Sequence, residues 1–388
     1  MAGPFVIISG IGPNAGGTGL LMQGLIAEAK GSDVRFVYRD KTRPRGWARL
    51  NPVWFIRQRW NRLWFGAQAR RAARTNGETL LLHPQSFAPD LFASLIESRA
   101  HSWVYVLDAY LFCERSYNVL PGGVRPCLRC HATTDAEGVR SGCFGAGRGW
   151  PLRERFAGWV RSGKIRLVAQ CASQARFWEK HYGLASPIPV VPLMVPDLEA
   201  FGEGRAARAG RPKVVFHGSP NAAKGIFAVR ELAQRMPGCD FLVPASLREV
   251  ARHGGPTEGW SANVSFERMS WSDGLEGAVR EAELVLCPSA WSAPVEGAVL
   301  KSMAHNGLVG LLPDATAFAG EVPAEARLDL DPQDWDGTAV RLTATLADPA
   351  RCAAVRAAAR RYIDAYRSAN AGMLRRLRDV CRLGPESA

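Results

Sequence analysis

The fold follows from one stretch of the chain, Cys287-Pro-Ser-Ala-Trp-Ser-Ala-Pro-Val-Glu296-Gly-Ala-Val-Leu-Lys301-Ser-Met-Ala304-His-Asn-Gly307. The apolar run that ends at Cys287 predicts a buried strand, and the Pro- and Gly-containing loop after it opens into a helix. A strand that passes through a short loop into a helix is the repeating unit of a parallel α/β sheet. The helix N-terminus presents backbone N–H groups, which favour the binding of a nucleotide or sugar phosphate.

This stretch resembles the donor-binding segment of family 4 glycosyltransferases, in which Pro-Ser-x-x-Glu-Pro-Phe-Gly precedes an apolar turn and Glu-Ala-Met-Ala-x-Gly. The matching register places Ala293 and Lys301 where the family has its two glutamates. We hypothesise that Glu296 takes over a sugar hydroxyl and that Lys301 contacts ribose oxygen or phosphate. The alternative is an ion pair between Glu296 and Lys301 at the helix start.

A second segment, Val214-Val-Phe-His217-Gly218-Ser-Pro-Asn221-Ala-Ala-Lys224-Gly225, predicts a strand, a glycine turn and a lysine at the mouth of a helix. It resembles the family segment Gly-Arg-x-x-x-x-Lys-Gly, whose basic side chains pair with the donor diphosphate. Lys224 matches the family lysine, whereas Ser219 stands near the place of the arginine. Phosphate binding would then depend on Lys224, the helix N-terminus and another base such as Arg268. A solvated lysine at a helix start is the alternative.

A glycine-rich loop, Gly10-Ile-Gly12-Pro-Asn-Ala15-Gly16-Gly17-Thr18-Gly19, follows the first predicted strand. Its Asn-x-Gly-Gly part resembles the first loop of GT-B glycosyltransferases, which implies that Gly16, Gly17 and Thr18 line a cleft. The spacing of Gly10, Gly12 and Ala15 also fits a dinucleotide fingerprint, with Asp40 near the end of the second strand. A merely tight turn is the third interpretation. A Walker A loop is excluded, because Thr18 stands where that motif needs lysine.

The same order of elements occurs twice along the chain. Strand-like runs occur at 5–9, 34–38, 79–82, 103–107, 165–169 and 189–192, and again at 213–217, 240–243, 264–266, 284–287 and 308–312. We therefore predict an α/β protein with two Rossmann-like domains facing across a cleft, and the resemblance implies that these domains form the GT-B fold. The predicted ranges are an acceptor-side domain at 1–196, a linker at 197–212, a nucleotide-sugar domain at 213–348 and a helical segment at 349–388 that returns to the N-terminal domain.

The chain has 388 residues, of which 47% are hydrophobic and 22% charged, as expected for two globular domains. Its longest apolar runs are far shorter than the roughly 18–20 residues of a membrane-spanning helix. The N-terminus suits a first strand better than a signal peptide, so we expect a cytoplasmic location. The net charge of +13 favours contact with an anionic partner such as nucleotide phosphates, lipid headgroups or nucleic acid.

Four of the nine cysteines, Cys113, Cys127, Cys130 and Cys143, have a spacing close to that of a four-thiolate zinc site. His131 could replace one ligand. An iron–sulfur cluster and a loop of reduced, packed thiols are the alternatives. A disulfide scaffold is not expected in the cytoplasm.

The residues around these cysteines carry a further resemblance. Leu107-Asp108-Ala-Tyr110-Leu-Phe-Cys113-Glu-Arg-Ser-Tyr117-Asn118 and Cys127-Leu-Arg-Cys130 resemble a bacterial subset of family 4 with His-Asp-x-x-x-Phe-Cys, then Ser-Tyr-Asn, then Cys-Leu-x-Cys. Leu107 replaces the histidine of many members, which leaves Asp108 as the cleft carboxylate or, alternatively, a turn cap. His83 and Tyr117 are expected on the acceptor side, His83 equally as a structural residue.

Residues 43–74 interleave arginines with tryptophans at positions 47, 54, 60 and 64. This pattern is typical of an interfacial helix on an anionic membrane. The alternative is a helix that packs on the domain with solvated arginines. No nucleic-acid motif accompanies the charge, so we expect no nucleic-acid partner.

Together the resemblances imply a retaining glycosyltransferase of surface polysaccharide or glycoconjugate synthesis, located in the cytoplasm or peripherally on the inner face of the cell membrane. It would use a UDP- or GDP-sugar and a glycan or lipid-linked acceptor, with zinc only as a structural ion. The implied catalytic residues are Asp108, Lys224 and Glu296. The implied donor-binding residues are Gly16, Gly17, Thr18, Gly218, Ser219, Lys224, Arg268, Pro294, Val295, Glu296, Gly297 and Lys301. The rival functions are a dinucleotide-dependent oxidoreductase and a non-catalytic assembly protein with a transferase fold.

Overall fold

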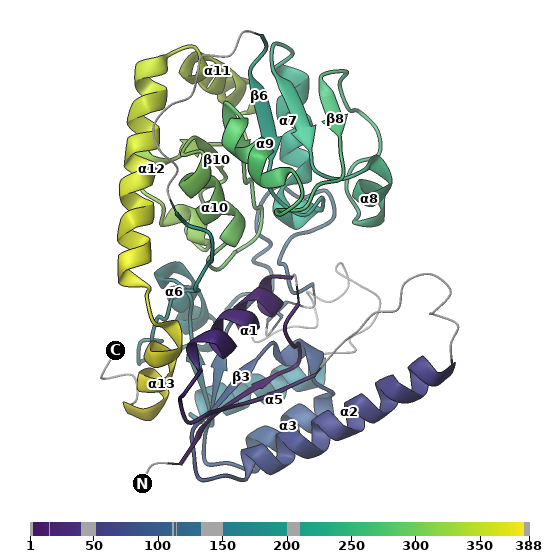
Figure 1. Ribbon diagram of the computed structural model, residues 1–388, viewed down its shortest axis with the longest axis vertical. Helices are drawn as coiled ribbons and strands as arrows, with labels where there is room; N and C mark the ends of the chain where they lie inside the picture. The colour runs from purple at the N-terminus through teal and green to yellow at the C-terminus, as the bar shows by residue number, and fades with distance from the viewer. Residues whose placement is uncertain are drawn as a thin grey trace. The chain divides into compact units, whose positions relative to one another are not determined.

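The computed structural model describes residues 3–14, 16–39, 52–110, 112–113, 115–132, 150–199 and 210–383. The chain forms two compact units, shown in Figure 1. Unit 1 comprises Met1–Glu114, His131–Met194 and Gly372–Ala388, and unit 2 comprises Arg115–Cys130 and Val195–Ala371. The division differs from the ranges expected from the sequence, since residues 115–130 group with unit 2. Of the helical segment predicted at 349–388, only residues 372–388 group with unit 1, and residues 349–371 group with unit 2.

Unit 1 contains a five-stranded parallel sheet in the order β2-β1-β3-β4-β5. Its strands are β1 (Phe5–Ser9), β2 (Val34–Tyr38), β3 (Thr79–Leu82), β4 (Ser102–Tyr105) and β5 (Ile165–Val168). Every residue of β1, β3 and β4 is buried. Short, almost continuously apolar strands of this kind are buried on both faces of a parallel sheet.

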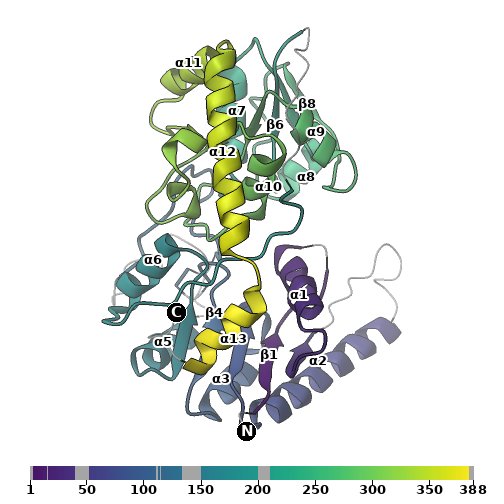
Figure 2. The same cartoon turned by 60° about the vertical axis from the view of Figure 1, so that its left-hand side comes forward.

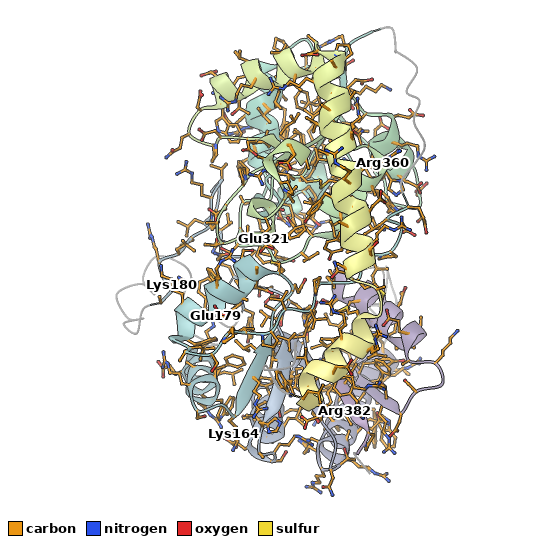
Figure 3. All side chains as sticks on the ribbon, turned by 90° about the vertical axis from the view of Figure 1, so that its left-hand side faces the viewer. Lys164, Glu179, Lys180, Glu321, Arg360 and Arg382 are labelled. Carbon is orange, nitrogen blue, oxygen red and sulfur yellow. The ribbon has the colours of Figure 1, made fainter. Side chains whose placement is uncertain are left out.

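The helices of unit 1 are α1 (Gly17–Glu28), α2 (Pro52–Ala73), α3 (Pro89–Glu97), α5 (Trp150–Arg161), α6 (Ala172–Tyr182) and α13 (Met373–Leu383), with a 3-10 turn η2 (Pro84–Ser86). Glu179 of α6, labelled in Figure 3, accepts a hydrogen bond from the backbone N–H of Ile188 at 2.7 Å. That bond ties the C-terminal end of α6 to the segment that follows it.

The C-terminal helix α13 returns to the sheet of unit 1, as the sequence predicted (Figure 2). Its residues Met373 and Leu377 belong to the same buried core as Phe5 and Leu80. The indole Nε1 of Trp103 in β4 donates to the carbonyl of Cys381 in α13 at 3.1 Å. The last helix of the chain therefore completes the core of the first sheet.

Unit 2 contains a six-stranded parallel sheet in the order β11-β10-β9-β6-β7-β8. Its strands are β6 (Lys213–Phe216), β7 (Asp240–Val243), β8 (Val264–Phe266), β9 (Leu284–Leu286), β10 (Val309–Leu311) and β11 (Leu328–Asp329). Its helices are α7 (Ile226–Arg235), α8 (Leu247–Arg252), α9 (Leu275–Glu281), α10 (Gly297–His305), α11 (Trp335–Leu346) and α12 (Pro349–Ala369), with short turns η3 (Ala222–Lys224), η4 (Phe318–Gly320) and η5 (Ala324–Ala326). Within the described ranges, no helix is both long and apolar enough to cross a membrane.

Both sheets have a point where the strand order reverses, between β1 and β3 in unit 1 and between β6 and β9 in unit 2. In parallel α/β sheets, ligands bind beyond the carboxyl ends of the strands at such a switch point, because the two loops there diverge. The loops after these four strands are therefore the parts of the molecule in which to look for a site.

Candidate functional site

The switch point of unit 2 carries the two residues to which the sequence assigned phosphate and sugar binding. Lys224 ends the turn η3 after β6, and its backbone N–H donates to Asn221 Oδ1 at 2.9 Å. Glu296 is the N-cap residue of α10, on the loop after β9. The side chains of Lys224 and Glu296 form an ion pair, with the lysine Nζ donating to Glu296 Oε1.

This ion pair is largely shielded from water. Glu296 is only 6% exposed, and its Oε1 also accepts a hydrogen bond from Ser289 Oγ at 2.8 Å. Burial alone lowers the pKa of Lys224, but the adjacent Glu296 carboxylate more than offsets it, so the pKa lies above the ordinary lysine value. Lys224 therefore carries its charge at neutral pH and is held at one position.

An aromatic pair covers the lysine. The ring centroid of Trp291 lies 5.3 Å from Lys224 Nζ, and Tyr117 packs edge-on against Trp291 at 4.6 Å between centroids. Trp291 is 3% exposed, and its indole N–H has no hydrogen-bond partner among the described residues. An unpaired buried donor costs about 1–3 kcal/mol, and it is a group that a bound ligand oxygen would satisfy.

Asn118 holds this aromatic pair in place. Asn118 is completely buried, its Nδ2 donates to Ser292 Oγ at 2.9 Å, and its Oδ1 accepts from the backbone N–H of Ser292 at 3.0 Å. The Ser-Tyr-Asn motif thus belongs to unit 2, and Tyr117, expected on the acceptor side, lies against the donor-side residue Trp291. Sequence reasoning quoted both segments but had no signal that joins positions 174 residues apart.

Lys301 forms an ion pair that was not predicted from the sequence, which suggested contact with the ligand's ribose or phosphate or, alternatively, with Glu296. Its Nζ donates to Asp197 Oδ2 at 2.8 Å, so the alternative of a Glu296–Lys301 ion pair is wrong. Lys301 Nζ also lies 4.7 Å from the ring centroid of Trp271. Position 301 therefore anchors the segment around Asp197 to α10.

Trp271 was not anticipated from the sequence, although it follows the end of β8. Its ring stacks on His217 with centroids 5.0 Å apart and planes 10° apart. Burial, and then the neighbouring side chains of Lys301, His305 and Lys224, lower the pKa of His217 to about 3. His217 is therefore neutral at physiological pH and pairs through Nδ1 with Ser302 Oγ at 2.8 Å.

Five further predicted donor residues fall on the loops after β6 and β9. Gly218 and Ser219 form the turn after β6, where the Ser219 carbonyl accepts from the Asn221 N–H at 2.7 Å. Pro294 and Val295 are buried, and Gly297 opens α10, whose N-terminus has no side-chain cap. The first N–H groups of α10 are therefore not occupied by a capping side chain.

A cavity of about 370 Å³ lies at the carboxyl ends of β6, β7 and β8. Its lining consists of residues from the loops after these strands and from α8, namely Pro220, Pro244, Ala245, Glu249, His253, Arg268, Met269, Ser270 and Asp273. Arg268 Nε donates to Glu249 Oε2 at 2.9 Å within it. Arg268 therefore lines a hollow beside the switch point, and its guanidinium already has a carboxylate partner.

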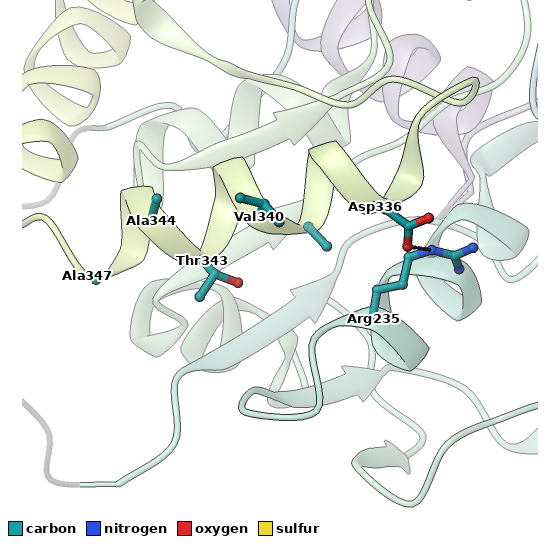
Figure 4. Close-up of a pocket in the computed structure, with 7 residues that line it drawn as sticks. Arg235, Asp336, Val340, Thr343, Ala344 and Ala347 are labelled. Carbon is teal, nitrogen blue, oxygen red and sulfur yellow. Dashed lines mark hydrogen bonds and ion pairs between the residues drawn. The ribbon is translucent and has the colours of Figure 1, made fainter.

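A larger hollow of about 560 Å³ lies between α7 and α11, where Arg235 pairs with Asp336 at 2.8 Å (Figure 4). Its other lining residues are Ala339, Val340, Thr343 and Ala344 of α11 and the C-cap residue Ala347. None of them belongs to a loop at the carboxyl ends of the strands, so this hollow is not part of the candidate site.

In unit 1, the glycine loop follows β1 at the switch point. A Cβ added at Gly10 would lie 2.4 Å from Ser86 Cβ, and one at Gly12 would lie 2.6 Å from the Tyr38 ring. Tyr38 therefore fills the space next to the second glycine of the dinucleotide spacing. Gly17 has no atom within 4 Å of an added Cβ and therefore faces open space, whereas the Gly16 N–H already donates to Asn14 Oδ1 at 2.7 Å. Thr18 follows in the first turn of α1, which has no side-chain cap. Ala15 and Asp40 lie outside the described residues.

Asp108 and His83 meet through Gln85 at the ends of β3 and β4. Gln85 Nε2 donates to Asp108 Oδ2 and lies 3.1 Å from His83 Nε2, while the Tyr110 N–H donates to Asp108 Oδ1 at 2.9 Å. His83 has a left-handed backbone, with φ 55°. Burial raises the pKa of Asp108 to about 7, against the hydrogen bonds from Tyr110 and Gln85. A carboxyl that is half protonated near neutral pH is suited to accept or donate a proton.

The described cysteines do not assemble a metal site. Cys113 is buried in unit 1, Cys127 and Cys130 belong to unit 2, and Cys143 lies outside the described residues. In the part of the chain that the structure describes, no three His, Cys, Asp or Glu side chains converge as metal ligands. His131 stacks on Phe177 at 4.0 Å and hydrogen-bonds through Nε2 to the carbonyl of Phe177 at 2.8 Å, so this nitrogen is engaged.

Comparison with known proteins relates the chain to solved structures. No family model matches the chain. No curated protein matches it either.

Three solved structures are similar to the chain over almost its whole length. A sucrose-phosphate synthase from Thermosynechococcus elongatus is 15% identical, with 98% of each chain covered and a TM-score of 0.64. WaaG, a glycosyltransferase involved in lipopolysaccharide biosynthesis, is 13% identical, with 98% of this chain and all of WaaG covered and a TM-score of 0.59. HepE from Anabaena, solved with UDP and glucose, is 11% identical, with 96% and 98% covered and a TM-score of 0.58. The likeness shows that the chain has the GT-B fold.

Proposed function

We propose that this protein is a glycosyltransferase that moves a sugar from a nucleotide-sugar donor to an acceptor hydroxyl. One observation carries the proposal, namely the Lys224–Glu296 pair at the switch point of unit 2, beside the uncapped N-terminus of α10. A fixed lysine and a helix N-terminus stabilise the negative charge that develops on a departing diphosphate.

In this proposal Lys224 exchanges its partner when the donor binds. The donor diphosphate forms an ion pair with Lys224 in place of Glu296. The Glu296 carboxylate, which still accepts a hydrogen bond from Ser289, can then accept one from a hydroxyl of the donor sugar. The indole N–H of Trp291 supplies a further donor to the same ligand. Asp108 serves the acceptor side in unit 1, where its pKa of about 7 suits a base for the acceptor hydroxyl.

The finer assignments rest on resemblance. The family 4 segments support transfer with retention at the anomeric carbon. The presence of UDP and glucose in the HepE structure supports a UDP-sugar donor, with a GDP-sugar as the alternative. We assign a glycan or lipid-linked acceptor in surface polysaccharide or glycoconjugate synthesis, and a place on the inner face of the cell membrane.

A second function, that of a non-catalytic assembly protein, is favoured by one observation. Lys301 replaces a family glutamate and is bound to Asp197, so it offers the ribose no carboxylate. Turnover of any nucleotide-sugar by the purified protein would rule this second function out.

Nucleotide binding tests the proposed function directly. We expect UDP or GDP to raise the unfolding temperature, because a ligand present at about 100 times its Kd stabilises the native state by about 2.7 kcal/mol. The measurement is thermal unfolding with UDP, GDP, NAD and FAD in parallel. Lys224→Ala should lose this rise in unfolding temperature. Its matched control is Lys213→Ala, which removes an exposed lysine from the opposite end of β6 and should keep the rise. Protection by NAD or FAD alone would favour the oxidoreductase.

Zinc at Cys113, Cys127, Cys130 and Cys143 stays a proposal for a structural ion that takes no part in the reaction. The spacing of the cysteines supports it, and the described residues alone do not form the site. Metal analysis of the purified protein should give close to one equivalent of zinc, reduced by Cys127→Ser but not by Cys352→Ser, a buried cysteine of α12. Less than a tenth of an equivalent of zinc would contradict the proposal.

A further inference from the structure

Helix α2 carries a set of large apolar side chains that are mostly exposed to solvent. Trp60 and Trp64 are 66% and 65% exposed, and Val53, Ile56 and Leu63 are 58–65% exposed. Side chains of this size are seldom so exposed in a cluster unless they meet a partner or a membrane.

The exposed side chains form one stripe along the helix. Successive residues of an α-helix are rotated by about 100°, so spacings of three and four residues fall on one face. Val53, Ile56, Trp60, Leu63 and Trp64 follow this spacing. We call these five residues the exposed stripe.

The opposite face of α2 holds the helix on unit 1. The buried or partly buried positions on that face are Trp54, Gln58, Asn61, Phe65 and Ala69, again three or four residues apart. Phe65 packs against Phe87, with ring centroids 5.7 Å apart. Figures 1 and 2 show the C-terminal half of α2 beside α3, whereas its N-terminal half extends past the sheet. The exposed stripe is therefore a second apolar face and not the one that packs on the core.

The charges of α2 identify the class of partner. The helix contains five arginines, Arg57, Arg59, Arg62, Arg70 and Arg71, and no Asp or Glu. By helical rotation, Arg57 lies on one side of the exposed stripe and Arg59 and Arg70 on the other. Arginines at both borders suit a surface that is apolar inside and anionic at its edge, whereas a second copy of α2 would bring like charges together.

We propose that α2 lies in the plane of an anionic lipid bilayer, with the exposed stripe in the acyl-chain boundary and the bordering arginines on lipid phosphates. Trp60 and Trp64 belong to the stripe and lie at this boundary between headgroups and acyl chains, where the amphipathic indole ring is favoured. The membrane contact itself does not depend on the proposed function. Only the reason for the contact, access to a lipid-linked acceptor, rests on that function. The inference extends that function by naming the surface that holds the enzyme to the membrane.

Vesicle co-sedimentation of the full chain tests the inference without any sugar nucleotide. We expect binding to phosphatidylglycerol-containing vesicles and little binding to phosphatidylcholine vesicles. Trp60→Ser/Trp64→Ser and, separately, Arg57→Gln/Arg59→Gln should each weaken the partition coefficient at least about tenfold. The matched controls are Val340→Ser/Leu383→Ser and Arg248→Gln/Arg361→Gln, which remove equally exposed apolar or basic side chains elsewhere and should bind as the wild type does.

Several results would overturn the inference. The first is equal binding of the wild type to both kinds of vesicle, and the second is undiminished vesicle binding by the Trp60→Ser/Trp64→Ser variant. The third is a wild-type protein that binds no vesicles but forms a concentration-dependent dimer, which the Trp60→Ser/Trp64→Ser variant does not form. Protection by UDP or GDP is measured on the same preparations. A protein that binds nucleotide but not vesicles would refute the membrane contact and leave the proposed function intact, and the reverse result would refute the function alone.

Discussion

Lys224→Ala is expected to abolish nucleotide protection and to destabilise unit 2. The substitution removes the charge that would meet the diphosphate and leaves Glu296 buried without its partner. Removing one partner of a buried ion pair costs about 3–5 kcal/mol. Loss of one transition-state donor typically lowers turnover by about 100- to 1,000-fold. Denaturant unfolding and nucleotide-sugar turnover measure the two effects.

The double variant Lys224→Met/Glu296→Gln separates binding from stability. It removes both charges and keeps the side-chain volumes similar, so most of the lost stability should return. Nucleotide protection should not return, because the cation is still missing. A double variant that binds UDP as well as the wild type would show that Lys224 does not meet the phosphate, and the proposed function would lose its main support.

Gly225→Ala is expected to prevent the loop after β6 from closing on the loop after β9. Gly225 has φ 79°, and an added Cβ would lie 1.8 Å from the carbonyl oxygen of Pro288. The left-handed conformation alone costs a non-glycine residue about 1–2 kcal/mol. The clash with Pro288 adds to that cost, so we expect a loss of more than about 3 kcal/mol together with loss of nucleotide protection.

Gly254→Ala is the matched control for this prediction. Gly254 has φ 73°, and nothing lies within 4 Å of its added Cβ, so only the conformational cost of about 1–2 kcal/mol applies. The free energies of unfolding of both variants come from denaturant titration. Equal losses in the two variants would mean that the contact between Gly225 and Pro288 does not position Lys224.

The strands of unit 2 show how much of the secondary structure the local pattern of apolar residues predicts. The runs at 213–217, 240–243, 264–266, 284–287 and 308–312 correspond to β6 to β10, because strands of a parallel sheet are mostly apolar. The edge strand β8 departs from this pattern, since Ser265 at its centre is exposed. The run at 189–192 predicted another strand, but it forms only a single bridge between Ala169 and Val190. Pro189 and Pro192 have no N–H to donate to a ladder. The two-residue strand β11 was not predicted, since so short a run leaves no periodic signal.

The sequence by itself determined the α/β class, the repeat of the strand–loop–helix order and the loops on which ligand-binding residues lie. These properties depend on the order of apolar, glycine and helix-forming residues within a few positions of one another. Only the tertiary structure decided that Glu296 pairs with Lys224 and not with Lys301, and that Asn118 fastens the loop of Trp291. It also decided that the stripe on α2 faces away from the core. Such pairings depend on which strand ends meet at the edge of a sheet and which helix face is covered, and no short stretch of sequence contains that information.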